Sequence, residues 1–138
     1  MTTTNYPGNY LDNEYCTWQI QVPVNKKIRL DFTEFKTETG KDYLLIYDTS
    51  RYDRPIIVFD GTTYKPPPFT SSGNVLRVRF ISDGATTRKG FSFNYKQVGK
   101  YNTHSISQSI FVVKFTRTVM MQMMMEKCYL FNREPEAP

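Results

Sequence analysis

Apolar and polar residues alternate along much of the chain, which is the pattern of strands with one buried face and one wet face. The apolar positions of the four alternating runs are Trp18, Ile20 and Val22; Ile28, Leu30 and Phe32; Leu76, Val78 and Phe80; and Phe91, Phe93 and Tyr95. A fifth run, Ile56–Phe59, is short and closed by Asp60-Gly61. Pro23-Val24-Asn25 separates the first two runs, which indicates a hairpin or a tight corner.

One run does not alternate. Tyr43–Tyr47 is continuously apolar or aromatic and predicts a strand buried on both faces or deep in a sandwich. Asp42 precedes it, and Thr39-Gly40-Lys41 before that is turn chemistry, with Glu38 on the far side. Two carboxylates therefore lie close together beside a rigid strand, which is a usual place for a binding site.

At least six strands at short intervals, with no helical period before residue 100, predict an all-β fold. A two-sheet antiparallel β-sandwich is the economical way to bury these faces, and we assign it to residues 1–98. The pattern changes after Lys96, so residues 99–138 form an unassigned tail, irregular or partly helical and partly disordered. Because the faces close by Tyr95, we expect residues 100–138 to be removable without unfolding the sandwich.

Composition and charge exclude several classes of function. The net charge of +5 is spread thinly, without the clustered basic patch that nucleic-acid binding needs. No window approaches the roughly 20 apolar residues of a membrane span. The start, Met1–Asn5, has neither a basic nor an apolar region, so no signal peptide is visible. Cys16 and Cys128 lack metal-ligand spacing, and we expect Cys16 to be a free thiol.

Several motifs in order resemble the CUB domain, an extracellular β-sandwich module with a jelly-roll-like fold that occurs in complement and astacin-type proteases and other secreted proteins. The similarity extends with few gaps from Asn5 to Tyr95. The motifs are N-Y-P-G-N-Y at Asn5–Tyr10, D-N-E-Y-C-T-W at Asp12–Trp18, I-R-L-D-F-T-E-F at Ile28–Phe35, D-Y-L-L-I-Y-D at Asp42–Asp48, S-S-G-N-V-L-R-V-R-F at Ser71–Phe80, S-D at Ser82–Asp83 and K-G-F at Lys89–Phe91.

The cysteines depart from the family pattern of two disulfides. Cys16 resembles the second cysteine of the first bridge, whose partner would lie upstream. The second bridge lacks both partners: no cysteine occurs near Thr39–Lys41, and Asp60 stands at the fourth position. The resemblance therefore implies an N-terminally truncated fragment of a longer secreted protein.

The resemblance also implies a site. Glu38, Asp42 and Asp83 match the acidic calcium ligands of many CUB domains, Tyr10 matches a supporting tyrosine, and the Ala85 backbone carbonyl matches a further oxygen donor. Oxygen ligands suit Ca²⁺, and three converging carboxylates repel one another without a cation. The implied function is a non-catalytic, extracellular, calcium-stabilised module that binds a protein partner presenting Lys or Arg beside the ion.

Other readings remain open at this point. Without the resemblance, the same acids are ordinary solvated loop residues. Paired carboxylates such as Glu38 and Asp42 suggest a glycosidase, but no sugar-stacking aromatic residues surround them, and a Ser-His-Asp triad would need His104 in the tail. Exposed Tyr52 and Tyr64 suggest a metal-independent carbohydrate-binding or adhesive module. The chain also fits an accessory domain of a secreted protease whose catalytic domain lies elsewhere.

Overall fold

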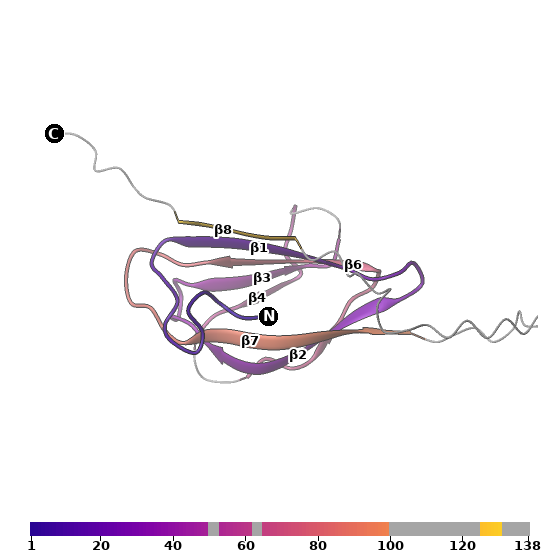
Figure 1. The fold of residues 1–138 in the computed structure, drawn as a ribbon, viewed down its shortest axis with the longest axis horizontal. Helices are drawn as coiled ribbons and strands as arrows, with labels where there is room; N and C mark the ends of the chain where they lie inside the picture. Colours follow the sequence, from indigo (N-terminus) through magenta and orange to yellow (C-terminus); the bar gives the residue numbers. More distant parts are fainter. Residues whose placement is uncertain (50–52, 62–64, 100–124, 131–138) are drawn as a thin grey trace, which may run out of the picture.

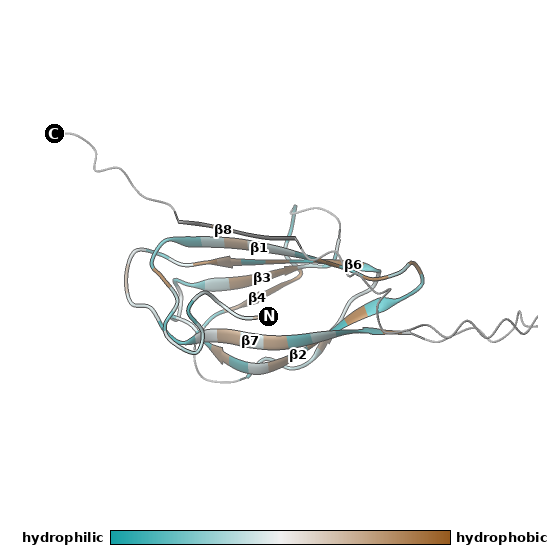
Figure 2. Cartoon of the chain, in the orientation of Figure 1, coloured by the Kyte–Doolittle hydropathy of each residue, from teal (hydrophilic) through white to brown (hydrophobic). Residues whose placement is uncertain are grey.

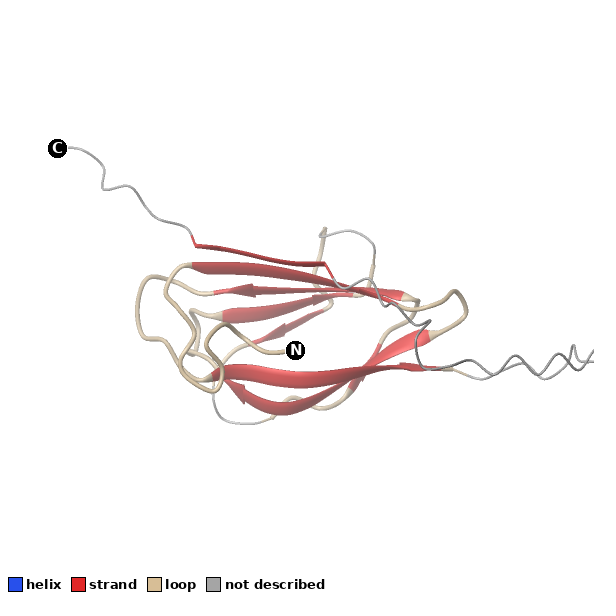
Figure 3. Cartoon of the chain, in the orientation of Figure 1, coloured by secondary structure: helices blue, strands red, loops and turns tan. Residues whose placement is uncertain are grey.

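Two antiparallel sheets face each other in the computed structural model, which describes residues 1–49, 53–61, 65–99 and 125–130 (Figure 1). The larger sheet has five strands in the order β4-β3-β6-β1-β8, and the smaller has three in the order β5-β2-β7. The described residues contain strands and loops but no helix (Figure 3), and so include no helix of the length and hydropathy that crossing a membrane requires. The strands are β1 (Glu14–Gln21), β2 (Lys27–Lys36), β3 (Tyr43–Tyr47), β4 (Ile57–Phe59), β5 (Phe69–Thr70), β6 (Val75–Ile81), β7 (Gly90–Val98) and β8 (Met125–Leu130).

The predicted all-β sandwich is confirmed, and the alternating runs form its principal strands. Along β1 and β6 every second side chain is buried, so each strand turns one face to the other sheet (Figure 2). β2 follows the same alternation as far as Phe32, after which a register shift makes Phe35 its next buried position. The segment at Pro23–Asn25 is a corner and not a hairpin, since β1 and β2 belong to different sheets. Asn25 adopts a φ of 70° there, and the Lys26 amide donates to the Pro23 carbonyl over 3.0 Å.

The run predicted to be buried on both faces behaves differently. Leu44 and Ile46 of β3 are fully buried against the other sheet. On the opposite side Tyr43 and Leu45 are half-buried, and Tyr47 is buried. β3 lies between β4 and β6 in the larger sheet, and only its Leu44 and Ile46 face belongs to the core between the sheets. Its position deep in the sandwich is therefore confirmed, but it has one core face.

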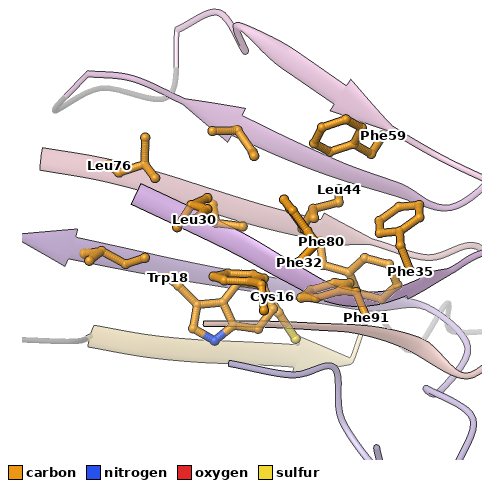
Figure 4. Close-up of a cluster of buried hydrophobic side chains, with 14 of the residues drawn as sticks. Cys16, Trp18, Leu30, Phe32, Phe35, Leu44, Phe59, Leu76, Phe80 and Phe91 are labelled. Carbon is orange, nitrogen blue, oxygen red and sulfur yellow. The ribbon is translucent and has the colours of Figure 1, made fainter. Parts of the chain in front are cut away.

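Aromatic side chains from both sheets fill the space between them (Figure 4). Phe32 of β2 lies 5.5 Å from Phe59 and 5.3 Å from Phe93, measured between ring centroids. Phe91 of β7 contacts Phe80 of the opposite sheet at 5.5 Å, edge to face. Such pairs add about 0.5–1.5 kcal/mol each beyond the area that they bury. The many aromatic residues of the chain thus pack the two sheets against each other.

The tail requires two corrections. Met125–Leu130 is a strand, β8, which pairs antiparallel with β1 and forms an edge of the larger sheet. The expectation that Cys16 is a free thiol is wrong, because it forms a disulfide with Cys128 across 112 positions. The physical reason is the register of the two strands, which sets these cysteines directly opposite each other. The Met run at residues 119–124 lies outside the described residues.

Gly90, at the start of β7, is a position where glycine is required. Its φ is +82°, and a Cβ added there would lie 1.9 Å from the hydroxyl oxygen of Thr3, a residue that is itself buried. We expect Gly90→Ala to lower the free energy of unfolding by about 3 kcal/mol, through backbone strain and overpacking. Urea unfolding would measure the loss. Gly73→Ala is the matched control, because nothing lies within 4 Å of its added Cβ; equal losses in the two variants would contradict this account.

Candidate metal centre

The pairing of β3 with β6 brings the three predicted acids to one end of the sandwich. Tyr43, the first residue of β3, lies opposite Ile81, the last residue of β6. Asp42 immediately precedes Tyr43, and Asp83 follows Ile81 by two positions, so the two turns meet at the left end of Figure 1. Glu38 begins the turn that leads into β3. Residues that are 45 positions apart in the sequence (83 − 38) thus become neighbours because the strands are antiparallel.

Carboxylate oxygens of Glu38, Asp42 and Asp83 all lie within 4.8 Å of one another. Asp42 is fully buried, while Glu38 and Asp83 are half-buried. One carboxylate oxygen of Glu38, Oε2, is shielded from solvent and has no hydrogen-bond partner among the described residues. A buried oxygen without a partner is costly, because it loses water and gains nothing in exchange. The cluster therefore presents at least one oxygen in need of a donor or a cation.

Tyr10 lies behind the cluster and is buried, with its ring 5.0 Å from that of Phe80. Its hydroxyl donates a hydrogen bond to Oδ2 of Asp42 and accepts one from the Glu38 amide over 3.1 Å. Burial, together with the bond to Asp42, raises the pKa of Tyr10 far above its ordinary value, so the hydroxyl stays protonated. Tyr10 consequently orients the carboxylate of Asp42 and the start of the turn that carries Glu38.

Burial and neighbouring groups shift the pKa of the Asp42 carboxylate in opposite directions. Burial is the largest influence and raises its pKa; the hydrogen bonds from the Tyr10 hydroxyl and the Asp83 amide lower it, and the charge of Asp83 raises it again. The Asp83 amide donates to Oδ1 of Asp42 over 2.9 Å, which ties the two turns together. Both oxygens of Asp42 are therefore engaged and fixed in direction.

Two hydrogen bonds hold the turn at Asp83 in place. Oδ1 of Asp83 accepts a hydrogen bond from the Ala85 amide over 3.0 Å, and the Asp83 carbonyl accepts one from the Asn13 amide over 2.7 Å. Ala85 itself is exposed in this turn. The structure thus brings Glu38, Asp42, Asp83 and Tyr10 together and sets Ala85 two residues from Asp83, while the role of its carbonyl as an oxygen donor stays a prediction.

Two further residues hold the turn that carries Glu38 and Asp42, and their role was not predicted from the sequence. The Thr37 hydroxyl donates to the Asp42 carbonyl over 3.1 Å and accepts from the Gly61 amide over 2.9 Å. Oδ2 of Asp60 accepts a hydrogen bond from the Gly40 amide over 2.6 Å. The Asp60-Gly61 turn thus holds the turn between β2 and β3. Its sequence signals were its position at the end of a short strand and the match of Asp60 to the fourth cysteine of the family pattern.

The contribution of the hydrogen bond between Asp60 and Gly40 to stability can be tested directly. Asp60→Ala should lower the free energy of unfolding by about 1 kcal/mol, because the Gly40 amide loses its acceptor. Asp60→Asn should retain most of the stability, since an amide oxygen can replace the carboxylate oxygen. Urea unfolding of both variants beside the wild type provides the measurement. An equal effect of the two substitutions would show that the charge of Asp60, and not its hydrogen bond, is what matters.

The structure argues against one alternative candidate site and does not describe the key residues of the other two. As a glycosidase pair, Glu38 and Asp42 are unsuited, because Asp42 is 0% exposed and no substrate can reach it. The tyrosines proposed for sugar binding, Tyr52 and Tyr64, and His104 of the hypothetical triad lie outside the described residues. Among the predicted site residues that the structure describes, the acidic cluster and Tyr10 form a single centre.

Comparison with known proteins shows where this architecture occurs. The family model described as CUB domain matches residues 1–95. Cubilin from Sus scrofa is 39% identical over 116 residues, covering 75% of this chain and 3% of the cubilin. Astacin-like metalloendopeptidase from Gallus gallus is 33% identical over 100 residues, covering 69% of this chain and 24% of that protein.

A solved structure, the MASP-1 CUB2 domain bound to Ca²⁺, superposes with a TM-score of 0.60 at 23% identity, covering 70% of this chain and 88% of that domain. This similarity shows the same sandwich fold. The chain spans only about 3% of the cubilin and 24% of the metalloendopeptidase that it matches. It therefore corresponds to one module of these longer relatives.

Proposed function

The chain belongs to the CUB-domain family, and on that premise we propose that it is a calcium-stabilised module that binds a protein partner through a basic side chain. CUB domains are non-catalytic, extracellular protein-interaction modules. The bound calcium and the basic side chain of the partner are the proposal. The convergence of three carboxylates within 4.8 Å is the observation that carries the proposal.

The chemistry of the donor set fits calcium. Ca²⁺ takes six to eight oxygen ligands in flexible geometry, whereas Mg²⁺ demands a tight octahedron, and zinc prefers nitrogen and sulfur. Glu38, Asp42 and Asp83 supply only oxygens, and the partnerless Oε2 of Glu38 is the kind of atom that a cation satisfies. We assign the Ala85 carbonyl as a further ligand, with Tyr10 supporting Asp42 from behind. A calcium-bound structure of the same fold, the MASP-1 CUB2 domain, supports the assignment.

When bound, the ion would supply positive charge that offsets the repulsion among the three acids and would cross-link the two turns. Three carboxylates and one Ca²⁺ leave a net charge of −1 at the cluster (−3 + 2), and two of the acids are half-buried rather than fully enclosed. A residual negative charge in a partly desolvated turn attracts a cationic side chain. This charge supports a partner that presents Lys or Arg at this end of the sandwich.

Titration of Ca²⁺ into the metal-stripped chain, followed by isothermal calorimetry, tests the proposal. One binding event is expected for the wild type, and Glu38→Gln should weaken it by about tenfold or more, because one ligand charge is lost. Asp53→Asn removes an exposed acid elsewhere and is the matched control. The proposal fails if no Ca²⁺ binds, or if Asp53→Asn weakens binding as much as Glu38→Gln does.

A further inference from the structure

Aspartate is followed directly by glycine at two places in the chain, Asp60-Gly61 and Asp83-Gly84. This dipeptide is prone to a reaction within its own backbone, because glycine has no Cβ to shield its amide nitrogen from the preceding carboxyl group. The two reacting groups belong to neighbouring residues, so ring closure is intramolecular and depends on how the turn holds them. The structure holds the two dipeptides in very different ways.

The reaction leaves the composition of the chain unchanged and needs no oxidant or cofactor. At Asp83-Gly84, the Gly84 nitrogen attacks Cγ of Asp83, and the amide proton leaves together with a carboxyl hydroxyl as water, which closes a succinimide ring. Water then adds to one of the two ring carbonyls. Addition at Cγ restores aspartate. Addition at the former main-chain carbonyl carbon breaks its bond to the nitrogen and gives isoaspartate, whose main chain runs through Cγ and is one methylene longer.

The Asp83-Gly84 turn is open to this ring closure. Gly84 and Ala85 are exposed, so water reaches the turn. Oδ1 of Asp83 accepts a hydrogen bond from the Ala85 amide over 3.0 Å, and the ring that this bond closes contains both Cγ of Asp83 and the Gly84 nitrogen. Within the part of the chain that the structure describes, the Gly84 amide donates no hydrogen bond. The carboxyl group is thus folded back over the peptide bond whose nitrogen attacks it.

The Asp60-Gly61 turn is held by hydrogen bonds that oppose the same reaction. Gly61 is buried, and its amide donates to the Thr37 hydroxyl over 2.9 Å. The Gly61 carbonyl accepts a second bond, from the Thr37 amide, over 2.9 Å. Oδ2 of Asp60 accepts from the Gly40 amide over 2.6 Å, which engages the carboxylate with a different turn. The Gly61 nitrogen can attack only after a local opening that breaks these bonds.

We propose that the Asp83-Gly84 turn is a site of spontaneous isoaspartate formation, and that the fold protects Asp60-Gly61 from the same reaction. Isomerisation also alters the candidate metal centre. Cγ of Asp83, whose oxygens converge with those of Glu38 and Asp42, becomes a main-chain carbonyl carbon. The carbonyl that accepts from the Asn13 amide becomes the free carboxylate instead. The consequence for calcium rests on the proposed function, whereas the reaction itself does not.

Incubation of the full 138-residue chain in EDTA, at neutral pH and body temperature in heavy-oxygen water, tests the proposal. Each passage through the succinimide leaves one heavy oxygen in the product, so mass spectrometry of proteolytic peptides follows Asp83 and Asp60 separately. Chromatography separates the isoaspartate peptide from the aspartate peptide. We expect heavy oxygen to enter at Asp83 about tenfold faster or more than at Asp60, because the bonds of the Asp60-Gly61 turn must open first.

Unfolding and one substitution provide the controls. In concentrated urea the two dipeptides should react at rates within about twofold of each other, because neither retains its native hydrogen bonds. Gly84→Ala should slow the reaction at Asp83 about tenfold, because the methyl group shields the nitrogen. The added Cβ would lie no closer than 3.4 Å to the Asn13 side chain, so this variant retains both the fold and Asp83.

The proposal is overturned if Asp60 reacts as fast as Asp83 in the folded chain, if neither reacts, or if Gly84→Ala leaves the rate at Asp83 unchanged. Chains that carry isoaspartate at position 83 should bind Ca²⁺ about tenfold more weakly than unreacted chains in calorimetry. Equal Ca²⁺ binding by the two forms would overturn the stated consequence for the metal centre. If the unreacted chain binds no Ca²⁺, the proposed function fails, and the heavy-oxygen result still decides whether Asp83 isomerises.

Discussion

Calcium should raise the melting temperature of this domain by on the order of ten degrees. A ligand that binds only the folded state adds RT ln(1 + [L]/Kd), which is about 2.7 kcal/mol when free Ca²⁺ is about 100 times the dissociation constant. For a domain of roughly 100 residues, each 1 kcal/mol shifts the midpoint by about 4–8 °C. The unfolded chain does not hold Glu38, Asp42 and Asp83 together, so the whole binding energy favours the folded state. Circular dichroism melts in millimolar Ca²⁺ and in EDTA provide the comparison.

Three controls make the calcium result specific. Mg²⁺ should have little effect, because the turns do not offer a tight octahedron. Asp83→Ala should abolish the difference between Ca²⁺ and EDTA, and it should slightly stabilise the calcium-free form by relieving repulsion among the acids. Asp53→Asn should leave the shift intact. Identical melts in Ca²⁺ and EDTA would show that the three acids are ordinary loop residues.

The strands could be predicted from the sequence because their burial is local and periodic. The positions of Trp18, Ile20, Leu76, Val78 and Phe80 specify which face of each strand enters the core, and the structure buries all five. The two-residue strand β5 has no such signal, since Phe69 and Thr70 are too few to show a period. Strand length, rather than strand propensity, thus limited what the pattern could show.

The geometry of the candidate centre could be anticipated only in part. The resemblance selected Glu38, Asp42 and Asp83, but their convergence depends on the register that sets Tyr43 opposite Ile81. Register between strands that are far apart in the sequence depends on the whole core and is not visible in either strand alone. The hydrogen bond from the Gly40 amide to Asp60 was missed for the same reason, because the two groups meet only after β3 and β4 have paired.

The tail was misassigned because long-range pairing leaves no local trace. Met125–Leu130 lacks turn signals and a clean period, and its strand form depends on the edge that β1 offers. A cysteine on each of two paired strands becomes informative only when the register is known. The interpretation of Cys128 as part of an unrelated segment is therefore wrong. β8, which carries Cys128, forms an edge of the larger sheet and is bonded to β1 through the disulfide.

Breaking the Cys16–Cys128 disulfide should produce the other large loss of stability. The bridge joins residues 112 positions apart, and the chain-entropy model assigns about 4.7 kcal/mol to a loop of about 100 residues. We expect Cys128→Ala to lower the free energy of unfolding by about 4 kcal/mol, which urea unfolding without reductant would measure. Cys128 is the residue to replace, because it is exposed, whereas Cys16 is fully buried and its removal would also disturb the core.

Reductant provides the control for this loss. Dithiothreitol should destabilise the wild type by the same amount and leave Cys128→Ala unchanged, since that variant has no bridge to reduce. A chain that ends near Val98 should lose similar stability yet remain folded and β-rich, because the two sheets already close over the aromatic core by Tyr95. Alkylation under non-reducing conditions should label neither cysteine of the wild type. Labelling of both, with no effect of reductant on the urea midpoint, would mean that β8 is held at the edge of β1 without a covalent bond.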